Sequence, residues 1–132
     1  MMRLAALSGA ALVAAPALAE GIVVPSGQPI TLHDVIWGAP GPEGLTVRFR
    51  FLAPQIARVG GSVDFDTAAA DMAALCETYA LPRTVTGTGP QPAQIIISLS
   101  DIAVPFGAAA PEATQYFESF GIENGACIWE VF

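Results

Sequence analysis

The clearest pattern of hydrophobic and polar positions is a strand-like alternation in the first half of the chain. The segment LTVRFRFLA (45–53) sets Arg48 and Arg50 on one face, as expected of a strand with one buried side. Its opposite, apolar face consists of Val47, Phe49 and Phe51. The segment ITLHDVIW (30–37) is also rich in β-branched and aromatic residues, and the intervening GAPGPEG is dense in turn formers. We therefore predict an antiparallel hairpin.

The register of this hairpin has two candidates. One places Asp34 opposite Arg48, and a shift by one residue brings His33 near the two arginines instead. Such a shift would move every side chain of the strand to the other face. The first strand alternates too weakly to choose between them, because Asp34 shares a face with Leu32 and Ile36.

A helical periodicity follows the hairpin. Its apolar stripe repeats at i, i+4, i+7, i+8 and i+11 and consists of Ala68, Met72, Leu75, Cys76 and Tyr79. Asp66 or Thr67 is expected to cap the N-terminus, and Asp71 adds charge that suits the N-terminal half. Pro82 is expected to stop the helix. Cys76 is therefore predicted to face the sheet that this helix covers.

Three further elements are predicted after a polar loop. QIIISLSD (94–101) has three consecutive isoleucines, which indicates a central strand covered on both faces. PEATQYFESF (111–120) is predicted to be a second helix, because Pro111 suits a first helical turn. The apolar stripe of that helix would consist of Ala113, Phe117 and Phe120.

The end of the chain predicts a short hairpin. Asn124 and Gly125 fit a type I′ turn between the segments 120–123 and 126–131. In the last strand, one face would pack beneath the first helix; it consists of Cys127, Trp129 and Val131. Both tryptophans, Trp37 and Trp129, are expected in the core, which is the default for aromatic residues within strand patterns.

The predicted order is β-β-α-β-α-β. Helices interspersed among strands, together with an antiparallel hairpin, favour an α+β two-layer sandwich. We expect a mixed or antiparallel sheet of about four or five strands with two helices on one face.

The N-terminus, MMRLAALSGAALVAAPALAE, has the layout of a secretory signal peptide. Arg3 forms a short positive region, and residues 4–16 are apolar and uncharged. The small residues of the A-L-A motif then place signal cleavage between Ala19 and Glu20. The apolar run is shorter than the roughly 20 residues that a membrane span needs, so stable membrane insertion after cleavage is not expected.

Cleavage would divide the chain into a signal peptide, 1–19, and one domain, 20–132. Removing 19 of the 132 residues leaves 113, enough to bury a core. The chain contains 12 acidic and five basic residues, has a formal net charge of −7, and has no lysine. Nucleic acids and anionic membrane surfaces are poor partners for such a chain, because both are bound through Lys and Arg.

Cys76 and Cys127 are the two cysteines of the chain. In an exported domain, two cysteines indicate one disulfide, with two buried thiols as the alternative. A bridge would close a loop of about 50 residues, worth about 4 kcal/mol in the chain-entropy model. Their wide spacing disfavours a redox pair. His33 is the single histidine, so a metal site is not expected either.

The sequence contains few candidates for catalysis. His33 and Asp34 are an adjacent acid and base, but neighbours on a strand point to opposite faces. Asp64 and Asp66 could pair as carboxylates, although helix capping already accounts for Asp66. Neither GxSxG nor SxxK is present. No catalytic residue, metal or cofactor is therefore predicted.

Arg48 and Arg50 carry the strongest indication of ligand binding. Two guanidinium groups on one strand face lie about 7 Å apart and could hold a carboxylate or a phosphate. Pairing with acidic neighbours across the hairpin is the simpler interpretation, since acidic residues are in excess. The weak ligand-site candidates are His33, Asp34, Arg48 and Arg50.

Three stretches also resemble a known family: QPITLHDVIWGAPGPEGLTVRFRFLAP, QIIISLSD and PEATQYFESFGIENGACIWEVF. They are similar to short exported proteins of alphaproteobacteria classed as a domain of unknown function. The resemblance covers essentially the whole domain after the signal peptide. It implies a bacterial cell-envelope setting and transfers no catalytic or binding residue.

Together these observations predict a periplasmic or secreted monomer. The first hypothesis is a non-enzymatic protein that binds an envelope protein partner or has a structural role there. The second is a module that binds a small acidic ligand through Arg48 and Arg50, with Trp37 as a wall. The third is an enzyme that uses His33.

Overall fold

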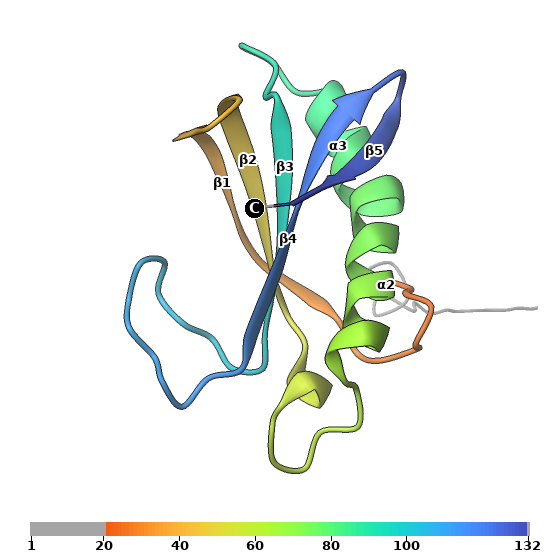
Figure 1. Cartoon of the computed structure of the whole chain (residues 1–132), viewed down its shortest axis with the longest axis vertical. Helices are drawn as coiled ribbons and strands as arrows, with labels where there is room; N and C mark the ends of the chain where they lie inside the picture. Colours follow the sequence, from red (N-terminus) through yellow and green to blue (C-terminus); the bar gives the residue numbers. More distant parts are fainter. Residues whose placement is uncertain (1–20, 132) are drawn as a thin grey trace, which may run out of the picture.

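A computed structural model describes residues 21–131 of the chain as one five-stranded mixed sheet with a helical layer on one side (Figure 1). The strands are β1 (Thr31–Gly41), β2 (Gly44–Leu52), β3 (Gln94–Ser100), β4 (Gln115–Glu123) and β5 (Ala126–Glu130). They lie side by side in chain order, and only the pair β2–β3 is parallel. The predicted signal peptide and its cleavage site, Ala19 and Glu20, lie outside the described residues.

The helical layer is one continuous segment between β2 and β3. It consists of α2 (Phe65–Leu75), the π-helical turn η2 (Cys76–Ala80) and α3 (Leu81–Val85), and a short 3-10 turn, η1 (Pro54–Ile56), precedes it. The element order is thus β-β-α-β-β-β. The α+β class and a mixed sheet of four or five strands are confirmed, whereas the prediction of a second helix is wrong.

The core lies between this helical segment and one face of the sheet. The predicted stripe faces inward: Ala68, Met72, Leu75 and Cys76 are fully buried, and Tyr79 packs against the cluster. The sheet contributes Val47, Phe49, Phe51, Ile95, Ile97, Leu99 and Phe120. Every residue of β3 is buried, which confirms the prediction of a central strand.

The end predicted for the first helix is wrong, because the chain stays helical past Pro82. The π turn explains how. The Leu81 amide bonds to the carbonyl oxygen of Cys76, five residues back, and Pro82 enters as an early residue of α3. Since an early helical position needs no amide donor, the ring is tolerated there.

The N-terminal cap of α2 is Asp64, not Asp66 or Thr67 as expected. Its carboxylate accepts a hydrogen bond from the Thr67 amide at 2.9 Å. This hydrogen bond lowers the pKa of Asp64 below its usual value. The helix therefore begins one turn earlier than its apolar stripe, with Phe65 as the first helical residue.

The segment predicted as a second helix, 111–120, is a turn followed by the first six residues of β4. Its residues fit both periods. Phe120 lies in the core, whereas Phe117 lies on the opposite sheet face, beside Ser98 of β3. The segment forms a strand because it pairs with β3 on one side and with β5 on the other. Both partners lie outside the segment, so its own periodicity does not indicate them.

The β4–β5 hairpin confirms the predicted turn. Asn124 and Gly125 both have positive φ, 52° and 75°, as a type I′ turn requires. The expected core positions of both tryptophans are wrong: Trp37 is 50% exposed and Trp129 59% exposed. Both lie on the two outer strands of the sheet, β1 and β5.

Among residues 21–131, no helix combines the length and apolar character that a membrane crossing requires. Cys76 and Cys127 form a disulfide between the helical turn η2 and strand β5, which confirms the predicted bond. Its formation is consistent with an oxidising compartment.

Candidate ligand-binding site

The sheet face that the helix does not cover carries polar side chains in an ordered row. Strand registers align Arg48 of β2 with Ile96 of β3, then with Ser119 of β4 and Glu130 of β5. The connection 101–114 lies on this side of the sheet, opposite the helix (Figure 1). The row thus brings four strands and one loop together at one surface.

Arg50 on this face is fixed by the fold. Its register partner is Asp34, and Nη1 donates to both carboxylate oxygens of Asp34 at 3.2 and 3.1 Å. Its Nη2 donates to the carbonyl oxygen of Val104. Only 7% of Arg50 is exposed. This arginine therefore anchors the 101–114 connection to the sheet and has little capacity left for a ligand.

Arg48 is bound differently. Its guanidinium carbon lies 5.4 Å from the ring centroid of Phe106 and 5.9 Å from that of Phe117. Among residues 21–131, no carboxylate oxygen lies within 4.0 Å of its nitrogens. Burial, and next the charge of Arg50, lowers the pKa of Arg48 below its usual value. A partly desolvated cation of this kind binds an anion more strongly than a cation in open water does.

A second polar group occupies the other side of the same face. The Gln94 side-chain amide donates to Glu130 Oε1 at 2.7 Å and to Ser119 Oγ at 3.2 Å. The Glu130 side chain lies flat across Gly121, where an added Cβ would come within 2.6 Å of Oε2. Glycine at position 121 is therefore what lets this carboxylate reach inward from the edge strand.

These groups line one cleft of about 750 Å³, a size typical of small-molecule sites. Its lining residues come from the end of β1, the β1–β2 turn, the strands β2 to β5, the 101–114 connection and the residue after β5. They are Ala39, Pro40, Gly41, Pro42, Glu43, Thr46, Arg48, Gln94, Ile96, Phe106, Ser119, Glu130 and Val131. Apolar surface from the prolines, Ile96 and Phe106 thus surrounds a few charged and amide groups.

The structure places the four predicted ligand-site residues in different surroundings. Of the four, only Arg48 lines the cleft. Asp34 and Arg50 pair with each other, so neither proposed register is right as stated, since Asp34 lies opposite Arg50. His33 is exposed at a register shift between Leu32 and Asp34.

The second hypothesis expected Trp37 to form a wall of the ligand site, and this expectation is wrong. Trp37 lies opposite Val47 in the register and contacts Phe49 edge-on, with 6.3 Å between ring centroids. It therefore faces the helical side of the sheet, away from Arg48. Phe106 and Phe117 occupy the place expected for it.

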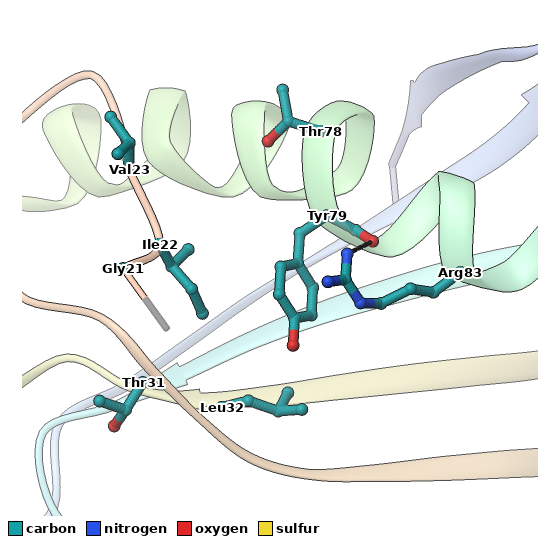
Figure 2. Close-up of a pocket in the computed structure, with 8 residues that line it drawn as sticks. All are labelled: Gly21, Ile22, Val23, Thr31, Leu32, Thr78, Tyr79 and Arg83. Carbon is teal, nitrogen blue, oxygen red and sulfur yellow. Dashed lines mark hydrogen bonds between the residues drawn. The ribbon is translucent and has the colours of Figure 1, made fainter. Parts of the chain in front are cut away.

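A second cavity, of about 760 Å³, lies between the helix and β1 (Figure 2). Figure 2 shows the Tyr79 ring directed from the helix toward β1, with Arg83 beside it. The Arg83 guanidinium stacks 3.6 Å from the Tyr79 centroid and donates to the Tyr79 carbonyl oxygen. Its cation is thus already engaged, and one wall is made by residues 21–23, next to the undescribed N-terminal segment. We regard this cavity as the weaker candidate.

Sequence reasoning missed most of the cleft. Phe106 lies in a connection with no periodicity. Gln94 and Glu130 belong to β3 and β5, and their side chains meet across β4, which lies between those two strands. Gly121 was the available signal, since an isolated glycine within a strand indicates close approach of another group. No group of three or more metal-ligating side chains occurs within residues 21–131.

The fold and the cleft define a small disulfide-linked α+β domain with a candidate ligand site on its open sheet face. Residues 5–132 match the family described as "Family of unknown function (DUF6497)", and the chain belongs to it. No curated protein matches the chain. No solved structure matches it either.

Proposed function

We propose that this protein is an exported, non-catalytic binding domain that holds a small ligand with an anionic group in the open-face cleft. The observation that carries the proposal is Arg48. It is a half-buried cation in a cleft of ligand size, and no described carboxylate neutralises it. In a chain with no lysine and 12 acidic residues, such a cation is expected to have a dedicated role.

The apolar lining supports a ligand with an apolar body. Phe106 and Ile96 provide surface beside the guanidinium, and an apolar wall with few polar groups is usual for small-molecule sites. The family membership is compatible with this proposal but carries no activity of its own.

The test is the Arg48→Gln variant, assayed by calorimetry with a panel of apolar carboxylates and phosphates. Loss of a charge-assisted hydrogen bond costs about 1.5–3 kcal/mol, so we expect a dissociation constant about 10- to 100-fold higher. Arg83→Gln is the matched control, because it removes the same charge from the helical side of the sheet. Equal affinity in wild type and Arg48→Gln, or no binding of any panel member, would contradict the proposal.

Export is part of the proposal and rests on the N-terminal pattern and on the disulfide. The first 19 residues have the layout of a signal peptide, and the Cys76–Cys127 bond suits an oxidising compartment. Mass spectrometry of the protein from the cell envelope should find Glu20 as its first residue. An intact N-terminus on the folded, oxidised protein would overturn this prediction.

Binding of a protein partner has weaker structural support. The two outer strands are poor templates for strand addition, because β1 contains two register shifts and β5 has five residues. The Cys127 amide of β5 also donates to Glu77 Oε2 at 2.6 Å. Exposed Trp129 is the feature in favour, and cross-linking in the envelope, with Trp129→Ala as a comparison, would test it.

A further inference from the structure

The cleft carries opposite charges on its two sides. Arg48 provides a cation from β2, and Glu130 provides a carboxylate from β5. Glu43, on the β1–β2 turn, adds a second carboxylate to the lining. A ligand with an anionic group alone would use only one side of this surface. The arrangement instead matches a molecule with a negative end and a positive end.

Glu130 has capacity to bind a cation. Gln94 donates to Oε1, whereas an ionised carboxylate can accept about four hydrogen bonds. No arginine nitrogen lies within 4.0 Å of it among residues 21–131, and the chain contains no lysine. A cation for this group therefore has to come from elsewhere, and a ligand ammonium is a suitable donor.

The spacing of the two strands sets an upper limit on the length of the ligand. Arg48 and Glu130 stand in one row, separated by Ile96 and Ser119. Three strand spacings correspond to about 14 Å between the two backbones. Both side chains lean over the face, since Glu130 reaches Gln94 of β3 and Arg48 reaches Phe117 of β4, so the charged groups are closer than that. A peptide of two or three extended residues, at about 3.3–3.6 Å each, stays within this limit.

The surface between the charges suits apolar side chains. Ile96 is central to the row, and Phe106, Pro40 and Val131 complete the apolar lining. The cleft volume of about 750 Å³ accommodates a molecule of this size.

We infer that the ligand is a short apolar peptide with free ends, with its carboxylate on Arg48 and its ammonium on Glu130. This inference rests on the proposed function and narrows it from an anionic ligand to a zwitterionic one. It gives Glu130, Gln94 and Gly121 one shared role: Gly121 makes room for the Glu130 side chain, and Gln94 holds its carboxylate toward the cleft.

The experiment measures calorimetric affinity of the oxidised protein for apolar tripeptides in four forms: free, N-acetylated, C-amidated and blocked at both ends. We expect each single block to raise the dissociation constant about 10-fold or more, which corresponds to about 1.4 kcal/mol. In Glu130→Gln, N-acetylation should no longer matter, whereas C-amidation still should. In Arg48→Gln, the reverse should hold.

Glu123→Gln is the matched control, since it removes one carboxylate from an exposed position in β4 near the hairpin turn. Melting temperatures of all variants show whether each one folds. If acetylated and free peptides bind equally well, the inference is overturned while the anion-binding function stands. Binding of simple carboxylates but of no tripeptide also overturns the inference and leaves the anion-binding function standing. If neither class binds, the inference and the proposed function fall together.

Discussion

At the scale of single residues, Asp71 has a structural role that the charge pattern of the sequence does not indicate. Its position in α2 suggests a favourable charge on an exposed helix, yet it is fully buried. Its carboxylate accepts hydrogen bonds from the Ser26 amide at 2.9 Å, the Ser26 hydroxyl at 2.5 Å and the Gln28 side-chain amide at 2.8 Å. It therefore ties the segment before β1 to the helix. Within residues 21–131, the Gln28 side-chain carbonyl Oε1 is buried and has no hydrogen-bond partner.

We predict that Asp71→Ala lowers the free energy of unfolding by about 3 kcal/mol, because hydrogen bonds to a charged group contribute about 1.5–3 kcal/mol. Urea denaturation measures the change. Asp66→Ala is the control on the same helix, and its stability should stay close to wild type, because Asp66 is exposed. Equal effects of the two substitutions would contradict the anchoring role.

At the residue scale, sequence reasoning about the ligand site was also incomplete. It identified Arg48 and Arg50 as a pair on one face, and the register confirms that they share it. Only the structure separates their roles. Arg50 donates hydrogen bonds to Asp34 and to the carbonyl oxygen of Val104, whereas Arg48 lines the cleft. Which arginine is neutralised depends on the strand register, and the register shift between Trp37 and Ala39 places Asp34 opposite Arg50.

At the scale of elements, local periodicity predicted those segments whose buried side is unambiguous. β2 alternates apolar and polar residues from Leu45 to Phe51, β3 is buried throughout, and α2 has one apolar stripe. The segment 111–120 is different, because Phe117 and Phe120 fit a helical stripe as well as opposite faces of a strand. Its hydrogen-bonding partners lie about 20 residues earlier and about 10 residues later. The hydrophobic periodicity of one segment carries no information about either partner strand.

Pro82 illustrates the same limit for helix ends. Proline normally stops a helix because it lacks an amide donor and collides with the preceding turn. Here the π turn lets Leu81 bond to Cys76 and places Pro82 at the start of α3. The helix continues because its inner face still has core to cover, with Leu81 and Thr84 both buried.

At the scale of the whole molecule, the disulfide joins the helical layer to an outer strand of the sheet. Cys76 belongs to the helical layer and Cys127 to the last strand, 51 residues later. β5 is an outer strand with one neighbour, so the bond holds in place the strand that carries Glu130. The integrity of the cleft thus depends on the helical side of the sheet.

We predict that Cys127→Ser lowers the free energy of unfolding of the oxidised protein by about 4 kcal/mol, following the entropy of a closed loop of this length. Thermal unfolding with and without reductant measures it. Reduced wild type and Cys127→Ser should melt at similar temperatures. An unchanged melting temperature in the variant, or two free thiols by mass in the wild type, would refute the prediction.

The sequence by itself determined the α+β class, the paired cysteines, the central strand and the final turn. Each of these depends on neighbours in the chain or on composition, which a linear pattern records. The tertiary structure alone decided the register of β1, the strand at 115–123 and the cleft. Those features arise where Arg48, Gln94, Phe106 and Glu130 meet across strands and a loop, and such contacts are set by packing between distant segments rather than by local preference.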